Sequence, residues 1–100
     1  MENFIKTRKS EEIEASPRVE EKLKERKLLI KDIKQIVLNN KMLGIVNQGG
    51  DVYKIWFEYT REHDFNVIIR IKGAKCYIVT AFPCEMERRV RHEKTRREKG

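Results

Sequence analysis

Three stretches of sequence decide the fold: DVYKIWFEY at residues 51–59, FNVIIRIK at 65–72 and KCYIVTAF at 75–82. β-Branched and aromatic residues dominate all three, which is typical of β-strands. The breaks between them, TREHD at 60–64 and GA at 73–74, have the length of hairpin loops. The sequence therefore predicts a three-stranded antiparallel meander.

The short break at 73–74 sets the register of the second hairpin. Gly73 suits the first position of a type II′ turn, because glycine adopts a positive φ there at no steric cost. The pairs that follow are Lys72 with Lys75, Ile71 with Cys76, Ile69 with Ile78, Val67 with Thr80 and Phe65 with Phe82. Side chains alternate along a strand, so the last four pairs share one largely apolar face, and we expect Thr80 to point into the core.

The opposite face is predicted to mix cations with aromatic residues. Pairing Tyr59 with Phe65 adds Tyr53, Ile55 and Phe57 to the core face. The other face then holds a row of Trp56, Ile68 and Val79, a row of Lys54, Arg70 and Tyr77, and Lys72 and Lys75 at the turn. RNA-binding sheets present charge and stacking surface together in this way. Cations also cover exposed sheet faces that bind nothing, so both interpretations stay open.

The length and charge of the chain narrow its class. A chain of 100 residues accommodates one domain with one modest core. A net charge of +7 favours an anionic partner, nucleic acid before a membrane. The 39% of charged residues also resembles the composition of proteins from hot environments. The start lacks a secretion signal and no apolar run approaches about 20 residues, so we expect a cytoplasmic protein.

The cysteines and histidines predict neither a metal site nor a cofactor. Cys76 and Cys84 are expected to be free thiols in the cytoplasm, although a disulfide between them stays open. His63 and His92 are isolated in a loop and a charged tail. Structural zinc sites need four nitrogen or sulfur ligands, which no group of residues supplies here.

The first half of the chain predicts helices after a flexible leader at residues 1–15. Ser16 suits a helix N-cap and Pro17 the first helical position. Apolar residues then recur at helical spacing up to Val37, with a phase slip at 27–29 that favours two helices over one. Residues 42–46 are predicted to add a short edge strand.

The predicted fold is α+β, with an N-terminal helix or helix pair packed on a meander of three to four antiparallel strands. We expect a single domain over residues 16–83. Residues 84–100 are predicted to form a basic, charged C-terminal helix or tail, since residues 85–100 contain seven Arg or Lys against four Glu.

This order of elements resembles a family of small domains grouped with the barnase, EndoU, colicin and RelE-like nucleases. The resemblance spans residues 16–83 and is carried by SPRVEEKLKERKL at 16–28, KDI at 31–33 and VTAFP at 79–83. Arg18 stands where the family pattern has a helix histidine, and Lys22 stands where it has its first arginine, whereas Arg26 matches the pattern. An arginine cannot replace histidine as a general acid or base, because its guanidinium stays protonated.

The resemblance implies a RelE-like RNA-directed toxin or a related metal-independent ribonuclease. It implies a catalytic group in which Arg70 clamps phosphate, Lys54 neutralises charge and Tyr77 stacks a base or relays a proton. The residues expected to bind RNA are Arg18, Lys22, Arg26, Lys72, Lys75, Trp56, Arg88 and Arg91.

The implied partners are RNA, including ribosome-bound messenger, and a small antitoxin anchored on the row of Trp56, Ile68 and Val79. Alternatively, that row belongs to a core closed by the leader or by the C-terminal segment, or to a homodimer interface. The alternative function is a non-catalytic RNA-binding or protein-binding module of the same fold, which the missing helix histidine favours. A third alternative is an interaction protein whose charge only keeps it in solution.

Overall fold

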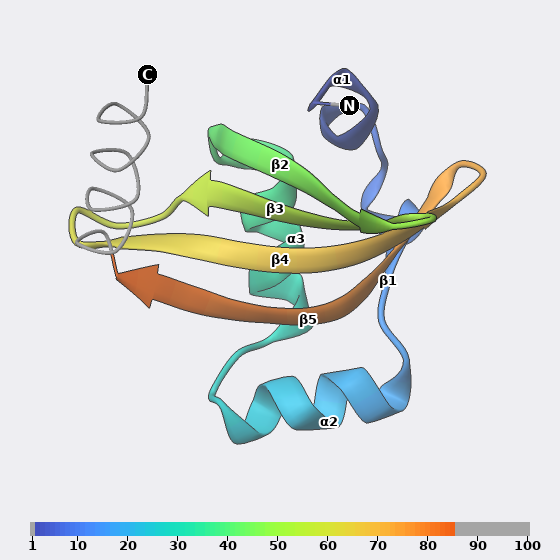
Figure 1. The fold of residues 1–100 in the computed structure, drawn as a ribbon. Coiled ribbons are helices and arrows are strands. Elements are labelled where there is room, and N and C mark those ends of the chain that lie inside the picture. Colours follow the sequence, from blue (N-terminus) through green and yellow to red (C-terminus); the bar gives the residue numbers. More distant parts are fainter. Residues whose placement is uncertain (1, 86–100) are drawn as a thin grey trace, which may run out of the picture.

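A computed structural model describes residues 2–85 (Figure 1). Within this range the helices are α1 (Glu2–Lys6), α2 (Pro17–Glu25) and α3 (Ile30–Asn39), with a 3-10 turn at Ser10–Glu12. The strands are β1 (Ile13–Glu14), β2 (Met42–Gly49), β3 (Val52–Glu58), β4 (His63–Lys72) and β5 (Lys75–Glu85). They form one sheet in the order β1-β5-β4-β3-β2. The predicted α+β class and antiparallel meander are therefore confirmed.

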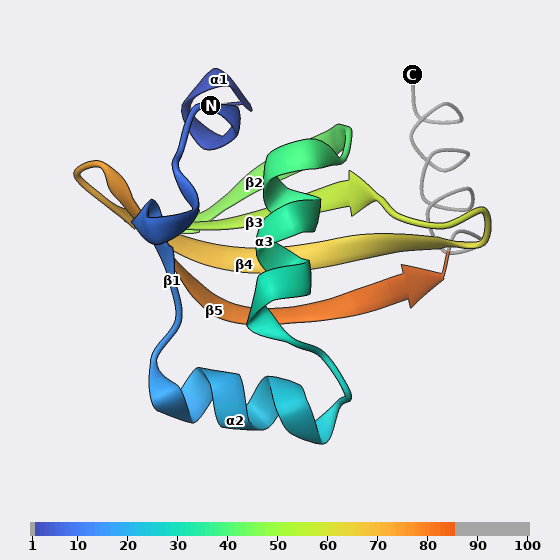
Figure 2. The same ribbon diagram turned by 180° about the vertical axis from the view of Figure 1, so that it is seen from behind.

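The core lies between α3 and one face of the sheet. Figure 2 shows α3 crossing that face, while α2 lies along the outer side of β5. The buried apolar side chains are Ile5, Ile13, Leu23, Ile33, Ile36, Val37, Ile55, Phe57, Phe65, Val67, Ile69, Cys76, Ile78 and Ala81. Only three of them come from α3, so the sheet and the N-terminal elements supply most of the core.

The two predicted helices are confirmed. Ser16 caps α2, because its side-chain oxygen accepts a hydrogen bond from the Val19 backbone N–H at 3.2 Å. The phase slip falls between α2 and α3, where Lys27 adopts a φ of 62°. Lys27 occupies the position after the C-cap, where a left-handed residue commonly ends a helix.

The flexible leader predicted for residues 1–15 is wrong over the described residues. Residues 2–14 form α1, the 3-10 turn and β1, and Ile5 and Ile13 are fully buried. β1 pairs in parallel with β5, which makes a five-stranded sheet where three to four antiparallel strands were expected. Two isolated apolar residues leave no periodic signal, so their burial depends on partners that come later in the chain.

The predicted register of the second hairpin holds only for the half near the turn. Ile71 pairs with Cys76 and Ile69 with Ile78, as expected. A β-bulge then shifts the register between Ile68 and Ile69, so Val67 pairs with Ala81 and Phe65 with Pro83. Thr80 and Phe82 therefore lie on the face opposite the core, which corrects both predictions.

The first hairpin differs from its predicted register by two residues. Phe57, not Tyr59, pairs with Phe65. A shift of two leaves every side chain on its predicted face, so Ile55 and Phe57 remain in the core. The cross-strand rows change, however, and the predicted row of Trp56, Ile68 and Val79 does not form.

The C-terminal part of the chain is described only as far as β5. The tail predicted for residues 84–100, with Arg88 and Arg91, lies outside the described residues beyond Glu85. No disulfide joins Cys76 and Cys84, which lie on opposite faces of β5. None of the described helices is long and apolar enough to cross a membrane.

Candidate nucleic-acid interface

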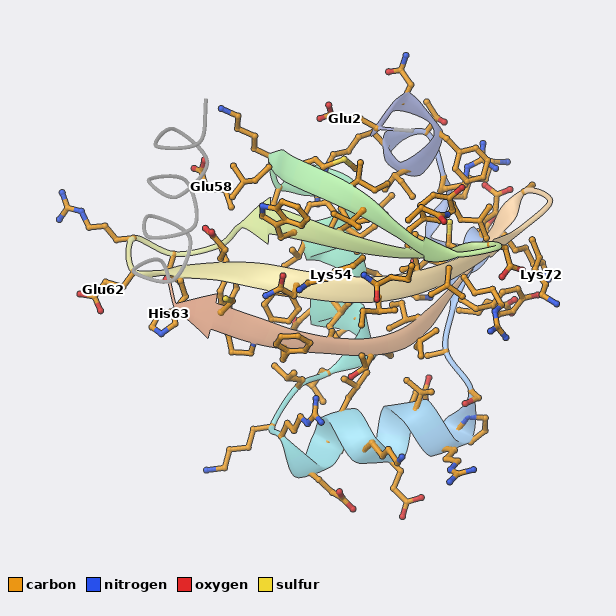
Figure 3. The ribbon with its side chains drawn as sticks, viewed as in Figure 1. Glu2, Lys54, Glu58, Glu62, His63 and Lys72 are labelled. Atoms are coloured by element: carbon orange, nitrogen blue, oxygen red, sulfur yellow. The ribbon has the colours of Figure 1, made fainter. Side chains whose placement is uncertain are left out.

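One face of the sheet carries no helix from residues 2–85, and Figure 3 views the molecule from that side. We call it the open face. Its cross-strand rows include Trp56-Asn66-Phe82, Lys54-Ile68-Thr80 and Val52-Arg70-Tyr77, and a further row, Glu58-Asp64-Cys84, lies on the other side of the Trp56 row. Aromatic side chains thus occupy both ends of the first row, and a lysine begins the second.

Trp56 is positioned by a glycine on the neighbouring strand. Gly44 of β2 lies opposite Trp56, and a Cβ atom placed there would come within 2.2 Å of Trp56 Cζ2. The indole therefore lies over the Gly44 backbone. Since β2 and β4 flank β3 on opposite sides, the ring leans away from Asn66 on β4. Trp56 and Phe82 both remain partly exposed.

The predicted catalytic residues share the open face but do not form the predicted row. Arg70 and Tyr77 are direct cross-strand neighbours, whereas Lys54 lies opposite Ile68 and only diagonal to Arg70. A diagonal pair is separated by roughly 7–8 Å, which places Lys54 farther from Arg70 than a direct neighbour. The shift of two residues in the first hairpin causes this difference.

Arg70 also has an acidic neighbour. Its Nε lies 3.3 Å from Asp51 Oδ1, in a pair whose side chains are 49% and 44% exposed. Exposed ion pairs of this kind contribute about 0–1 kcal/mol, so a phosphate can compete for the guanidinium. Asp51 nonetheless reduces the positive potential at the predicted phosphate clamp.

The two lysines at the β4–β5 turn differ in their surroundings. Lys72, labelled in Figure 3, pairs with Lys75 across the turn, and both are exposed. Lys75 Nζ lies 3.3 Å from Glu14 Oε2 on β1. This acidic neighbour was not expected, because β1 was not predicted.

Three predicted RNA-binding cations, two in α2 and one at its C-cap, lie along one side of that helix. Arg18, Lys22 and Arg26 are spaced by four residues and are all exposed. Arg26 Nη1 donates hydrogen bonds to Thr80 Oγ1 at 3.3 Å and to the Ala81 carbonyl at 3.4 Å. Arg26 therefore adds a cation beside the bulge of β5, at the margin of the open face.

Among the residues that the structure places on this face without a prediction from the sequence are Asn66, Thr80 and Phe82. Asn66 is 5% exposed, and no hydrogen bond joins its side chain to another residue of the described chain. The only sign of Asn66 in the sequence was an amide residue within the largely apolar run FNVIIRI at 65–71. Thr80 and Phe82 were missed because no local pattern marked the bulge.

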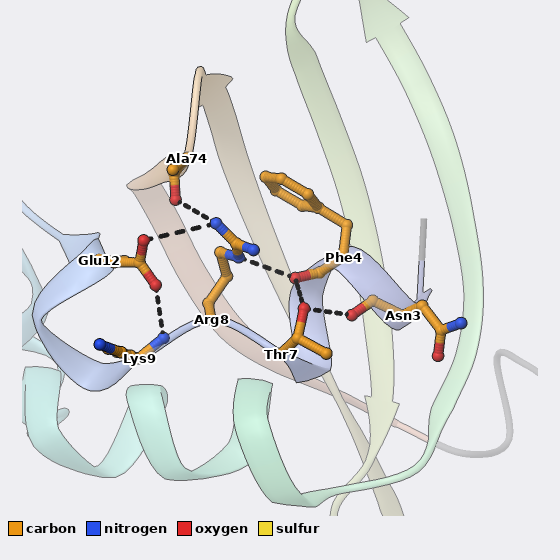
Figure 4. Close-up of polar contacts among 7 residues, drawn as sticks. All are labelled: Asn3, Phe4, Thr7, Arg8, Lys9, Glu12 and Ala74. Carbon is orange, nitrogen blue, oxygen red and sulfur yellow. Dashed lines mark hydrogen bonds and ion pairs between the residues drawn. The ribbon is translucent and has the colours of Figure 1, made fainter.

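Other cations near the sheet serve the structure. Figure 4 shows Arg8 joining α1 to the β4–β5 turn: its Nη1 donates to the Ala74 carbonyl at 2.8 Å and its Nε to the Phe4 carbonyl at 3.0 Å. Arg8 also lies 3.5 Å from Glu12 Oε2. This side chain is therefore committed to holding the N-terminal segment in place.

Lys6 caps the C-terminal end of α3. Its Nζ donates to the Val37 carbonyl at 2.9 Å and to the Asn40 carbonyl, and it lies 5.0 Å from the centroid of the Phe57 ring. Burial lowers the pKa of Lys6 from its ordinary value, while Glu2 opposes the shift. A cation at a helix C-terminus is favourable, so Lys6 too has a structural role.

No metal centre is visible in this part of the chain. Residues 2–85 contain no group of three or more His, Cys, Asp or Glu side chains that could hold a metal ion. His63, expected in a loop, is the first residue of β4, and its backbone N–H donates to Thr60 Oγ1 at 2.9 Å.

Comparison with known proteins identifies the family. Residues 1–69 match the MJ0788 family, which covers more than half of the chain, so the chain belongs to that family. This description names no activity, and it does not connect the chain to the RelE-like nuclease group. No curated protein and no solved structure matches the chain significantly.

Proposed function

We propose that this member of the MJ0788 family is a non-catalytic module that binds single-stranded RNA on its open face. The observation that carries the proposal is the row in which Trp56 and Phe82 flank β4, with Lys54 directly beside it. Aromatic rings next to cations on a sheet suit single strands, because bases stack on the rings while the cations contact phosphates.

The geometry allows both contacts at once. Trp56 and Phe82 lie on β3 and β5, which are separated by β4 and hence by about 10 Å. Lys54 begins the adjacent row, and Arg26 reaches the same row at Thr80. A strand of RNA that crosses β3, β4 and β5 would meet Trp56 and Lys54 on β3. On β5 it would meet Phe82, with Arg26 beside it.

The charge of the chain supports this choice of ligand. A net charge of +7 attracts nucleic acid, and each phosphate contact releases counterions. The affinity should therefore fall steeply as the salt concentration is raised. A fraction of the binding free energy should persist at high salt, because stacking does not depend on salt.

A metal-independent ribonuclease of the RelE-like kind is the second candidate, favoured by the direct pairing of Arg70 with Tyr77. In that reaction the RNA 2′-oxygen attacks the adjacent phosphorus, the Tyr77 hydroxyl relays the 2′-hydroxyl proton to solvent by accepting it while releasing its own proton, and Arg70 stabilises the charged phosphate. The bond to the 5′-oxygen breaks, that oxygen takes up a proton from solvent, and a 2′,3′-cyclic phosphate remains. We rank this candidate second because Lys54 lies opposite Ile68 and Asp51 contacts Arg70.

The binding test uses fluorescence anisotropy with a labelled single-stranded RNA oligomer. Trp56→Leu removes a stacking surface worth about 1–3 kcal/mol, so we expect the Kd to rise roughly tenfold with little change in its salt dependence. Lys54→Gln should weaken binding and lower the slope of log K against log salt by about one.

Lys31→Gln on α3 is the matched control, since it removes the same charge from an exposed position on the helix that covers the other face. It should change binding much less than Lys54→Gln. Equal losses from both lysine variants, or no loss from Trp56→Leu, would contradict a site on the open face.

The same RNA, incubated in EDTA, separates the two candidates. The binding module leaves the RNA intact. Cleavage to a cyclic phosphate that disappears in Arg70→Ala, while binding persists, would establish the ribonuclease instead.

A further inference from the structure

We infer that an RNA strand bound on the open face continues past β5 onto α2, where three cations contact its successive phosphates. In the order in which the strand meets them, the cations are Arg26, Lys22 and Arg18. The inference rests on the proposed function, because it extends the path of the same ligand. It adds one flank of α2 to the binding surface.

Arg26 lies where the open face and α2 meet. It is the C-cap residue of α2, and its Nη1 donates to Thr80 Oγ1 at 3.3 Å and to the Ala81 carbonyl at 3.4 Å. Thr80 belongs to the open-face row that begins at Lys54. Figures 1 and 2 both show α2 beside β5, so the contact of Arg26 identifies the flank of α2 that borders the open face.

Helical geometry places the other two cations along the same flank. Leu23 is the buried residue of α2 and marks the side that faces the core. Each residue advances by about 100° around the helix axis, which puts Arg26 about 60° from Leu23. Lys22 and Arg18 follow at about 100° and 140° in the same direction, and neighbouring members of the set are about 6 Å apart along the axis. That spacing is comparable with the distance between successive phosphates of an extended single strand.

The charges on this flank are available to a ligand. Arg18 and Lys22 are exposed, and within residues 2–85 no residue of α2 takes part in an ion pair. Two cations of the sheet, by contrast, each lie 3.3 Å from a carboxylate oxygen. Glu21 and Glu25 lie on the outermost side of α2, about 160° from the buried side. The cations of the flank therefore lose no ion pair when they contact phosphates.

The test compares two labelled single-stranded RNA oligomers by fluorescence anisotropy over a range of salt concentrations. One has about 4 nucleotides and covers only the sheet, whereas the other has about 12 and also reaches α2. Each phosphate contact on a single strand contributes about 0.7 to the slope of log K against log salt. Lys22→Gln should therefore lower that slope by about 0.7 for the long oligomer and leave the slope for the short oligomer unchanged. Arg18→Gln should have the same effect.

Lys24→Gln is the matched control. Lys24 is exposed on the same helix and carries the same charge, but it lies about 200° around the axis from Lys22, on the opposite flank. Its substitution should leave the slopes for both oligomers unchanged. Lysine and glutamine have similar helix propensities, so both variants keep the helix intact.

The outcomes separate the inference from the proposed function. Equal changes in slope from Lys22→Gln and Lys24→Gln, or no change from Lys22→Gln with the long oligomer, would overturn the path along α2. An equal effect of Lys22→Gln on both oligomers would overturn it as well, because that contact would then not depend on a strand long enough to leave the sheet. Each of these results leaves binding on the open face intact. Failure of the wild type to bind the long oligomer would overturn the proposed function itself.

Discussion

At the scale of single residues, Gly44 shows how a position that weakens a strand in isolation can be required by its neighbour. Glycine has no side chain to pack and lowers the preference for strand structure. Here the Trp56 indole covers that position so closely that any Cβ atom would overlap the ring. The glycine therefore sets where the indole lies on the open face.

Gly44→Ala should destabilise the protein by about 1–3 kcal/mol, because the new methyl group must displace a ring and not the end of a flexible side chain. RNA binding should weaken as well, since the stacking surface moves. Urea unfolding and anisotropy measure the two effects.

A double-mutant cycle with Trp56→Leu provides the control for this contact. If Gly44→Ala costs as much stability in the Trp56→Leu background as in the wild type, the clash with the indole is not the cause.

At the scale of elements, α1 shows that a short helix without a periodic pattern can still belong to the core. Its five residues hold one fully buried side chain, Ile5, and its end is tied to α3 through Lys6. Isolated helices of this length are unstable in water, so α1 exists because of these tertiary contacts.

Ile5→Ala should lower the free energy of unfolding by about 2–5 kcal/mol, the usual effect of truncating a large apolar side chain in a core. Asn3→Ala, at an exposed position of the same helix, should stay within about 0.5 kcal/mol of the wild type. Urea unfolding curves give both values. Equal midpoints for the two variants would mean that α1 does not pack on the core.

The bulge in β5 decides which of its side chains face the core. One extra residue between the two halves of the hairpin moved Thr80 and Phe82 to the open face and put Ala81 into the core. Phe82 thereby became available for stacking. Among residues 2–85, no strand pairs with the outer side of β5 at Pro83, since β1 pairs only with Cys76 and Tyr77, and edge positions of a sheet tolerate proline.

At the scale of the whole molecule, the buried thiol of Cys76 links stability to pH. Burial raises the pKa of Cys76 above its ordinary value of 9.0, with Arg8 opposing the shift. The unfolded chain therefore loses this proton before the folded protein does. Above about pH 9 the unfolded state holds fewer protons, so the free energy of unfolding falls as pH rises toward the folded pKa.

Urea unfolding of the wild type and of Cys76→Ala, just below and well above pH 9.0, tests this expectation. Other groups titrate equally in both proteins, so the wild type should lose more stability than the variant over this range. Parallel losses would show that the thiol ionises as readily in the folded protein as in the unfolded chain.

The sequence by itself determined strands β2 to β5, helices α2 and α3 with the Ser16 cap, and the face on which Lys54, Arg70 and Tyr77 lie. These features follow from local preference and from the alternation of side chains along a strand, which survives a register shift of two residues.

Only the tertiary structure decided which side chains are neighbours on that face. Contacts between distant parts of the chain place Asn66 between Trp56 and Phe82 and bring Asp51 to Arg70. Such contacts also make residues 2–14 fold into α1, the 3-10 turn and β1. Such contacts form when they lower the free energy of the whole fold, so they cannot be predicted from a local pattern of residues.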